Sequence, residues 1–474
     1  MTPVTCFANR KVALFGLGGS GFATARALVA GGALVTAWDD NAVARARAGN
    51  AGIEVLDLAR ADWSTFQSLV LTPGVPLTDP KPHWTVDRAR EHGVEIIGDI
   101  ELFCRERAHV APGSPFVAIT GTNGKSTTTA LIAHLFRENG FDVQMGGNIG
   151  TPALYLEPPA VGRIHVLEVS SFQIDLAPSL DPSVGVLVNL TPDHIDRHGT
   201  MERYAAVKER LVNSSQCALV SVDDPWCWSI GARRSETYLG DPNRASFPVS
   251  ARMRLPQGVF VEGTQIVSTI RGGEDEIICD LSGIASLRGL HNAQNAAFAS
   301  ACALMWKLTA AEIASAMRSF PGLPHRMEET GRIGHILFIN DSKATNADAA
   351  EKALLSFRNI FWIAGGQMKE GGIRPLLPLM DRVAKVYLIG ASMDAFAHSL
   401  ADRTPFVRCG TLDAAVVLAA EDAGESRESE AVVLLSPACA SYDQFANYEA
   451  RGDAFRALSA KLIAATGAAQ PGRG

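Results

Sequence analysis

Short apolar runs alternate along this chain with longer segments whose apolar residues recur at helical spacing. The runs at residues 34–38, 116–119 and 336–340 are typical of strands buried in a parallel sheet. Further strands are expected at 69–71, 166–169, 184–190, 360–364, 386–390 and 432–435. Helical spacing occurs at residues 131–136 and in the alanine-rich segment 292–307. Strands that alternate with helices in this way predict an α/β protein with mostly parallel sheets.

One motif carries more chemical information than any other. Residues 118–128 read Ala-Ile-Thr-Gly-Thr-Asn-Gly-Lys-Ser-Thr-Thr, between an apolar strand and an amphipathic helix, which is the layout of a phosphate-binding loop. Gly121 and Gly124 allow the backbone to turn its N–H groups toward phosphate oxygens. Lys125 suits the β- and γ-phosphates, and the Ser126 hydroxyl suits Mg²⁺. The alternative is a turn that binds nothing, because the usual first glycine is missing, but strand, Gly-Lys-Ser and helix together favour a nucleoside triphosphate.

A second glycine-rich turn lies near the start of the chain. Gly16, Gly18 and Gly21 form G-x-G-x-x-G between a strand and a helix, and Asp39 follows about twenty residues later. This pattern suits any pyrophosphate at a helix N-terminus with a polar group facing the acidic residue, so NAD and a UDP moiety both satisfy it. A tight turn without a ligand is the third interpretation. The turn at 72–74 ends a neighbouring strand and would lie beside this loop.

Composition narrows the class of protein. At 474 residues the chain is too long for one ordinary core, so two or three domains are expected. A net charge of −7 argues against a nucleic-acid partner, and no apolar stretch reaches the roughly 18 residues of a membrane span. The eight cysteines are scattered without a C-x-x-C pair, which favours reduced thiols over disulfides or zinc. We therefore expect a cytoplasmic protein.

Three further side chains could face the phosphate loop. Glu168 lies in an apolar strand, where a buried carboxylate is costly unless it is paired or metal-bound; a surface carboxylate at the strand end is the alternative. His194 follows the next strand, where a metal ligand would be placed, although on its own it is more simply a loop histidine. Lys208, taken alone, is more simply a solvated lysine on a helix.

Four segments together resemble the Mur ligases, ATP-dependent enzymes that add amino acids to the peptidoglycan precursor. They are GTNGKST at 121–127, GNIG at 147–150, EVSSFQ at 168–173 and NLTPDH at 189–194. Two later segments resemble the branch of the family that adds D-glutamate: PHRME at 324–328 followed by NDSKATN at 340–346, and SPACASYDQF at 436–445. The string at 341–346 is specific, because sister ligases carry different strings there. The similarity extends from about residue 11 to about residue 460.

The resemblance implies an α/β fold of three domains. The first, at 1–110, is a Rossmann-like domain that binds the UDP-substrate. The second, at 111–321, is a central P-loop ATPase-like domain that binds ATP. The third, at 322–474, is a Rossmann-like C-terminal domain that contributes nucleotide and amino-acid contacts. Turn-rich links at 108–114 and 320–324 support both boundaries.

The resemblance also implies the site residues, position by position. Contacts to the UDP-substrate are expected from Gly18, Gly19, Ser20, Asp39, Asp40, Thr72, Pro73, Gly74, Asn148 and His194. Contacts to ATP are expected from Gly121, Thr122, Asn123, Gly124, Lys125, Ser126, Thr127, Asn295, Arg326, Asp341 and Lys343. Contacts to D-glutamate are expected from Thr345, Lys369, Ser441 and Tyr448. The implied catalytic residues are Lys125, Glu168, His194, Lys208 and Arg326, and the implied metal ligands are Ser126, Glu168, His194 and Lys208 as a carbamate.

The implied reaction follows from the chemistry of a carboxylate. A free carboxylate does not react with an amine at neutral pH, so ATP must first convert it to an acyl phosphate. The resemblance implies UDP-N-acetylmuramoyl-L-alanine and D-glutamate as substrates, ATP and two Mg²⁺ ions as cofactors, and a monomer. Alternatives are another ligase of the superfamily, such as a folylpolyglutamate synthetase, an NAD-linked oxidoreductase based on the first glycine-rich turn, and a nucleotide-binding regulator. The oxidoreductase leaves the loop at 121–126 unexplained, and the regulator leaves Glu168, His194 and Lys343 without a role.

Overall fold

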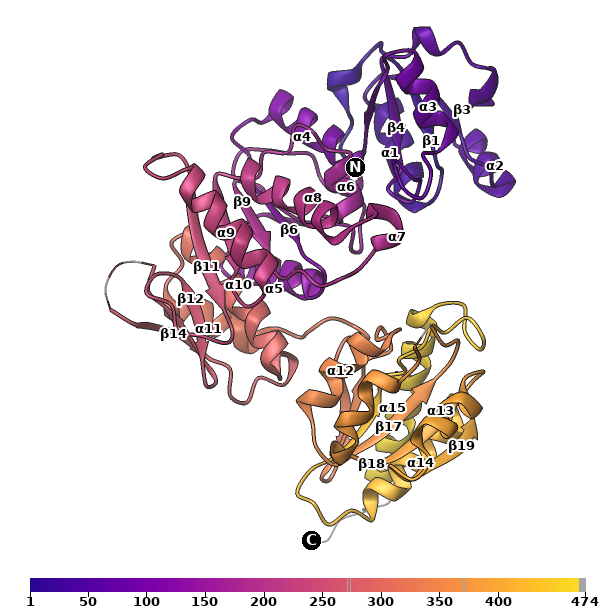
Figure 1. Ribbon diagram of the computed structural model, residues 1–474, viewed down its shortest axis with the longest axis vertical. Coiled ribbons are helices and arrows are strands. Elements are labelled where there is room, and N and C mark those ends of the chain that lie inside the picture. The colour runs from indigo at the N-terminus through magenta and orange to yellow at the C-terminus, as the bar shows by residue number, and fades with distance from the viewer. Residues whose placement is uncertain (271, 273, 370, 469–474) are drawn as a thin grey trace. The chain divides into compact units, whose positions relative to one another are not determined.

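The structure is a computed structural model that describes residues 1–270, 272, 274–369 and 371–468. The described residues form three sheets and divide into two compact units. Unit 1 contains Met1–Ser282 and Asn292–Ser319 and holds the first two sheets (Figure 1). Unit 2 contains Gly283–His291 and the described residues from Phe320 onward, and it holds the third sheet.

The first sheet is parallel throughout, with the strand order β3-β2-β1-β4-β5. Its strands are β1 (Lys11–Phe15), β2 (Leu34–Trp38), β3 (Glu54–Val55), β4 (Ser68–Leu71) and β5 (Glu95–Ile97). Its helices are α1 (Gly19–Ala30), α2 (Ala42–Asn50), α3 (Trp84–Glu91) and α4 (Asp99–Val110). The order changes direction between β1 and β4, and ligands of such sheets bind outside the carboxyl ends of the strands at that point.

The second sheet has the order β14-β13-β12-β11-β10-β9-β6-β8-β7, parallel from β7 to β12 and antiparallel from β12 to β14. Its strands are β6 (Phe116–Thr120), β7 (Val143–Gly147), β8 (Ile164–Glu168), β9 (Val184–Leu187), β10 (Cys217–Ser221), β11 (Ala245–Ser250), β12 (Val259–Glu262), β13 (Gln265–Ser268) and β14 (Glu276–Asp280). The accompanying helices are α5 (Lys125–Glu138), α6 (Ser171–Asp175), α7 (Ile195–His198), α8 (Met201–Ser214), α9 (Pro225–Thr237), α10 (Leu290–Met305) and α11 (Ala310–Ser319). Because β6 lies between β8 and β9, the segments that follow these three strands meet at one edge of the sheet.

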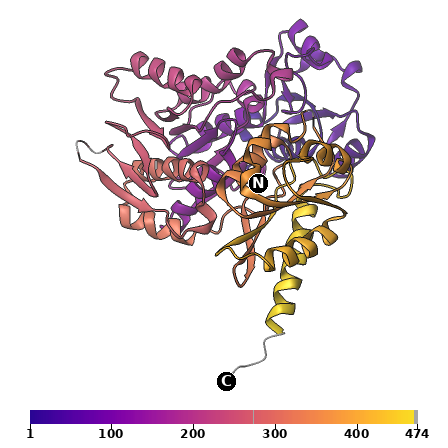
Figure 2. The same ribbon diagram turned by 60° about the horizontal axis from the view of Figure 1, so that its bottom comes forward.

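The third sheet has the order β15-β16-β20-β17-β18-β19, parallel except for β15. Its strands are β15 (Glu328–Ile333), β16 (Ile336–Asn340), β17 (Ile360–Gly365), β18 (Val383–Ile389), β19 (Phe406–Gly410) and β20 (Ala431–Leu435). Its helices are α12 (Ala347–Ser356), α13 (Met393–Leu400), α14 (Leu412–Gly424) and α15 (Tyr448–Ala468). Helix α15, yellow in Figure 2, packs against β15 and β16 with its first turns and continues toward the C-terminus.

The sequence pattern predicted the fold class correctly, and the expected strands at 34–38 and 336–340 have the observed bounds. The strand expected at 184–190 ends at Leu187 instead, because the next residues leave the ladder and bond to the loop after β6. The segment Gly283–His291 belongs to unit 2, where Arg288 forms an ion pair with Glu430 at 2.8 Å. The three domain ranges stay a prediction. Among the described helices, none has the length and apolar character needed to cross a lipid bilayer.

Candidate functional site

The loop between β6 and α5 has the shape that the sequence motif predicts. Gly121 and Gly124 have φ angles of +147° and +83°, a region that favours glycine. A Cβ atom on Gly124 would lie 2.5 Å from Asn295 Oδ1 and 3.2 Å from Val188 Cγ1, so a side chain does not fit there. Helix α5 begins at Lys125, and the first N–H groups and the dipole of a helix favour an anion at this end.

Asn189 fastens this loop from the neighbouring strand. The N–H of Thr122 donates to Asn189 O at 2.9 Å, and the N–H of Asn123 donates to Asn189 Oδ1 at 2.8 Å. The amide of Asn189 donates back to Asn123 O at 3.0 Å. Sequence reasoning did not single out Asn189, although an amide placed directly after a buried strand beside β6 is a usable signal.

Two lysines direct their ammonium groups at the loop carbonyls. Lys125 Nζ donates to Gly121 O at 3.1 Å and to Thr122 O at 2.8 Å. Lys208 Nζ donates to Thr120 Oγ1 at 3.0 Å and to Gly121 O at 2.9 Å, and the residue is only 1% exposed. Burial lowers the pKa of Lys208 well below its usual value, and the positive charge of Lys125 lowers it further. The solvated-lysine interpretation is therefore wrong.

Glu168 ends β8 with a buried carboxylate that is 2% exposed, so it is not a surface carboxylate. Its Oε1 accepts a hydrogen bond from Asn148 Nδ2 at 2.8 Å, and its main-chain oxygen accepts one from Asn148 N–H at 2.8 Å. Its Oε2 has no hydrogen-bond partner among the residues that the structure describes. A buried carboxylate oxygen left without a donor is costly, and it suits a hard cation such as Mg²⁺.

His194 lies just before α7 in a left-handed conformation, with φ of +53°. Its Nε2 is 3.4 Å from Asp193 Oδ2, and its ring centroid is 5.1 Å from that of Phe172. Partial burial lowers its pKa; the charge of Asp193 opposes this shift, and the charges of Lys125 and Lys208 reinforce it. The ring is therefore neutral near pH 7, which is the form that binds metals.

The glycine-rich turn after β1 contacts the turn after β4. A Cβ atom on Gly16 would overlap Thr72 Oγ1, and one on Gly21 would overlap Gly16 O, so both glycines are required for this close approach. Gly18 and Gly19 are exposed, and no described atom lies within 4 Å of a Cβ placed on either. The predicted pyrophosphate loop is thus open to solvent at its tip, and Ser20 follows it in the first turn of α1.

Asp39 stabilises this turn from within. Its Oδ2 accepts a hydrogen bond from Leu17 N–H at 2.5 Å, and its Oδ1 accepts one from Asn41 N–H at 2.7 Å. The main-chain oxygens of Asp39 and Asp40 accept hydrogen bonds from Arg45 Nη1 at 2.6 and 2.9 Å. Both carboxylate oxygens of Asp39 therefore position the backbone, a role that the fingerprint interpretation did not include.

The turn Thr72, Pro73 and Gly74 is linked to the segment that carries His194. Arg197 Nη1 donates to Gly74 O at 3.2 Å, and the Arg197 guanidinium lies 4.6 Å from the centre of the Phe172 ring. Sequence reasoning expected a salt-bridged loop at this segment. Arg197 instead reaches the first sheet, so the predicted UDP-substrate group and the predicted metal group adjoin within unit 1.

In unit 2, the residues expected to contact the nucleotide gather at the carboxyl end of β16. Asp341 Oδ1 accepts a hydrogen bond from Met327 N–H at 3.2 Å, and its Oδ2 accepts one from Ser436 Oγ at 2.8 Å. Burial raises the pKa of Asp341 to about 7, although the nearby charge of Arg326 opposes the shift. Lys343 Nζ lies 5.0 Å from the centre of the Tyr448 ring, which brings these two predicted residues together.

The other residues expected to contact D-glutamate lie on three segments of unit 2. Thr345 follows Lys343 directly and donates its N–H to Lys343 O at 2.9 Å. Lys369 is exposed after β17, and Ser441 is buried after β20. An antiparallel bridge between Gln367 and Ala440 joins the last two segments just before these residues.

The comparisons with known proteins agree with this arrangement. Residues 119–303 match the family profile of the Mur ligase middle domain, and residues 325–439 match that of the Mur ligase glutamate ligase domain. A curated relative from Nitrobacter hamburgensis is 58% identical over 469 residues, which are 98% of this chain and 99% of the relative. One from Brucella abortus is 57% identical over 457 residues, 96% and 97% of the two chains. Both carry the name UDP-N-acetylmuramoylalanine--D-glutamate ligase.

Solved structures share the fold at low sequence identity. The UDP-N-acetylmuramate-alanine ligase of Thermotoga maritima matches with a TM-score of 0.57 and 18% identity, over 96% of this chain and all of that one (100%). The pseudomurein peptide ligase type C of Methanothermus fervidus matches with a TM-score of 0.55 and 19% identity, over the same shares of 96% and 100%. Sequence identity above half along nearly the whole chain, two family profiles and this fold show that the chain belongs to the Mur ligase family of ATP-dependent, amide-bond-forming ligases.

Proposed function

We propose that this chain joins D-glutamate to the carboxyl group of UDP-N-acetylmuramoyl-L-alanine, with hydrolysis of ATP to ADP and phosphate, as a cytoplasmic step of peptidoglycan precursor synthesis. The observation that carries the chemistry is the gathering of the phosphate loop, Glu168 and Lys208 at one edge of the second sheet. The choice of substrates rests on the name of relatives that are 55–58% identical over at least 96% of the chain. A monomeric state stays a prediction.

The first step activates the carboxylate. A carboxylate oxygen of the substrate attacks the γ-phosphorus of ATP, the bond to the β-phosphate oxygen breaks, and ADP leaves an acyl phosphate. Negative charge gathers on the γ-phosphoryl oxygens during this transfer. Lys125, the N-terminus of α5 and Arg326 are the positive groups that would stabilise it.

Two anions must approach each other in this step, and metal ions would offset their repulsion. One pair of unit charges 4 Å apart repels by about 4 kcal/mol at an effective dielectric constant of 20. Ser126, Glu168 and His194 would hold Mg²⁺, which supplies positive charge between the two reactants. The donor set fits such an ion, since Glu168 Oε2 is buried without a hydrogen-bond donor in the described chain and His194 favours its neutral form.

Lys208 would take part as a carbamate. Only a neutral amine reacts with CO₂, and the lowered pKa of Lys208 favours that form. The lysine nitrogen forms a bond to the carbon of CO₂ and loses a proton, so that an anionic group replaces a cation. This change would supply a second negative charge close to Glu168 for holding metal.

The second step forms the amide. The amine of D-glutamate attacks the acyl carbon, phosphate leaves with the bonding oxygen, and the nitrogen loses a proton. The two carboxylates of the amino acid need cations and hydroxyl donors. Lys369, Thr345, Ser441 and Tyr448 would supply them from the segments that follow β16, β17 and β20 in unit 2.

The amino acid decides between this function and those of sister enzymes. With ATP, Mg²⁺ and UDP-N-acetylmuramoyl-L-alanine, phosphate release should require D-glutamate. L-glutamate, L-lysine and meso-diaminopimelate should give rates at least about tenfold lower, because binding groups arranged for one isomer are left unpaired by another. Equal rates with another amino acid would reject the assignment, and a change in nicotinamide absorbance with added NAD would favour the oxidoreductase.

Gly124→Ala should weaken ATP binding by at least about tenfold, since the new Cβ atom meets Asn295 Oδ1 and a left-handed alanine is strained by about 1–2 kcal/mol. Calorimetric titration with MgATP measures the effect. Gly140→Ala is the matched control: Gly140 lies beyond the other end of α5 with φ of +80°, and no described atom lies within 4 Å of its Cβ position. The control should bind MgATP like the unaltered protein, and equal losses in both variants would contradict a crowding effect at Gly124.

A further inference from the structure

The segment that carries Arg326 is a strained turn at the start of unit 2's sheet. His325 and Met327, the residues on both sides of Arg326, have φ angles of +61° and +48°. Side chains rarely adopt this left-handed conformation, and it persists only where surrounding contacts fix it. Two such residues around one arginine indicate that the direction of the Arg326 backbone is imposed from outside the turn.

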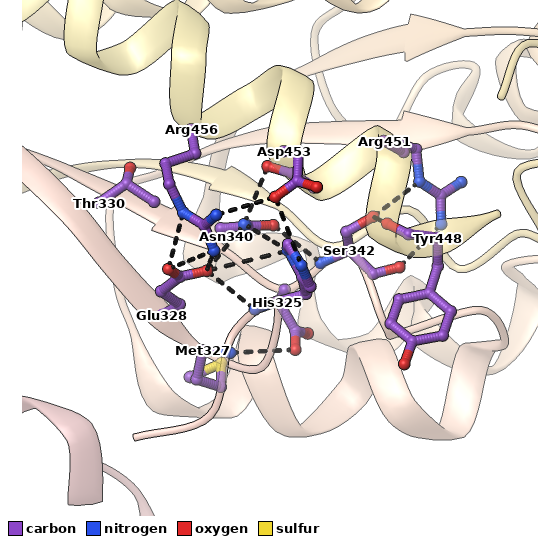
Figure 3. A network of polar contacts seen from close by, with 12 residues as sticks. His325, Met327, Glu328, Thr330, Asn340, Ser342, Tyr448, Arg451, Asp453 and Arg456 are labelled. Atoms are coloured by element: carbon purple, nitrogen blue, oxygen red, sulfur yellow. Dashed lines mark hydrogen bonds and ion pairs between the residues drawn. The ribbon is translucent and has the colours of Figure 1, made fainter. Parts of the chain in front are cut away.

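Glu328 provides much of that constraint (Figure 3). Its Oε2 accepts hydrogen bonds from His325 N–H at 2.8 Å and from Asn340 Nδ2 at 3.0 Å. Its Oε1 accepts two from Arg456, from Nε at 3.0 Å and from Nη2 at 2.8 Å. One carboxylate thus joins the strained turn, the end of β16 and the second turn of α15, and the two-bonded arginine fixes its orientation.

Helix α15 also shapes the space beside the His325 ring. A Cβ atom on Gly452 would overlap this ring, so the helix approaches the turn as closely as only glycine allows. Asn340 Nδ2 lies 3.1 Å from both His325 Nδ1 and Gly452 O, and Asp453 Oδ1 lies 3.7 Å from His325 Nε2. The ring is held on several sides, as Figure 3 shows.

This arrangement is connected to the other groups expected at the nucleotide. His325 O accepts a hydrogen bond from Lys343 N–H at 3.1 Å, and Met327 N–H donates to Asp341 Oδ1 at 3.2 Å. A change in the turn would therefore displace Asp341 and Lys343 as well as Arg326. The contacts of Glu328 and Arg456 lie behind these residues, so neither need touch the substrate to affect it.

We propose that Glu328, oriented by Arg456 and seated against Gly452, is a positioning residue that sets Arg326, Asp341 and Lys343 for the triphosphate. This inference rests on the proposed function for the identity of the nucleotide. It assigns to the beginning of α15 a part in ATP binding, through side chains that contact other protein groups.

The test compares substrate affinities in the full-length chain. Glu328→Ala should raise the Kd for MgATP by about tenfold and lower kcat, because small displacements of binding groups have large effects, while the Kd for the UDP-substrate stays within about twofold. Arg456→Lys, which keeps one donor for Glu328, should have a smaller effect than Arg456→Ala. Gly452→Ala should act in the same direction as Glu328→Ala without any change of charge. Thermal unfolding accompanies each titration.

Arg332→Gln is the matched control. Arg332 lies on the same strand, β15, and pairs with Glu329 at 3.2 Å and Glu430 at 3.3 Å, outside the contacts of Glu328. It should leave the Kd for MgATP unchanged. Unchanged MgATP affinity in folded Glu328→Ala and Gly452→Ala would overturn the proposal, as would an equal loss of affinity for both substrates.

The test also separates this inference from the proposed function. If the unaltered protein binds MgATP but forms no product with D-glutamate, the proposed function fails while the comparison of MgATP affinities still decides the role of Glu328. If the unaltered protein does not bind MgATP, both are rejected.

Discussion

Lys125→Ala is expected to abolish ATP consumption while it leaves affinity for the UDP-substrate near that of the unaltered protein. The Lys125 ammonium lies within the phosphate loop, on the carbonyl oxygens of Gly121 and Thr122. Without it, a concentrated positive charge disappears where negative charge develops, and the loss of one such group typically costs about 10²–10³ in rate. Phosphate release measures the first effect, and calorimetric titration with the UDP-substrate measures the second.

The separation of the two effects follows from the two loops of unit 1. The UDP-substrate is expected at the turns after β1 and β4, and none of the described hydrogen bonds of Lys125 reaches those turns. Lys11→Ala, at the exposed start of β1, is a control that removes a lysine from the same unit and should keep full activity. Loss of both ATP consumption and UDP-substrate binding in Lys125→Ala would indicate misfolding or a different role for this lysine.

Lys208→Ala is expected to lose activity by about 10²-fold or more, and to recover part of it when acetate or formate is added. The truncation removes a buried side chain beside Thr120 and Gly121, and it leaves a space that a small carboxylate can enter. Such an anion would replace the negative charge of the proposed carbamate. Phosphate release over a series of carboxylate concentrations, at constant ionic strength, measures the recovery.

Lys208→Arg is the control for this recovery. Arginine fills the space, stays charged and does not form a carbamate under these conditions, so added carboxylate should not restore its activity. Chloride at equal ionic strength should likewise fail with Lys208→Ala. If no carboxylate restores Lys208→Ala although the variant unfolds at a normal temperature, the lysine acts as an ordinary ammonium group.

Local sequence was enough to predict the phosphate loop. Strand, glycines, Lys-Ser and helix are consecutive, and the observed φ angles of Gly121 and Gly124 follow from that order. The strands at 34–38 and 336–340 were equally local, because their apolar runs are bounded by polar or glycine-rich turns. Family resemblance, rather than the residues themselves, added Asn295, Asp341 and Lys343.

Contacts between distant segments were not predictable from the sequence. The burial of Lys208 depends on α8 crossing beside β6, 87 residues earlier in the chain, and a lone lysine on a helix gives no sign of this. Asn189 bonds to the phosphate loop only because β9 lies next to β6. Asp39 was expected to face a ligand, but its carboxylate binds N–H groups of Leu17 and Asn41, since the turn after β1 leaves them without other partners in the ladder.

The assignment of Gly283–His291 to unit 2 has a practical consequence for expression of fragments. A protein cut once at Ser319 would retain this nine-residue piece, although its contacts, such as those of Arg288 with Glu430 and with the Phe357 ring, lie on the missing side. The complementary fragment would lack the same piece. The two units are therefore not consecutive modules that recombination or cloning could exchange at one junction, and a clean separation would require a rearranged gene.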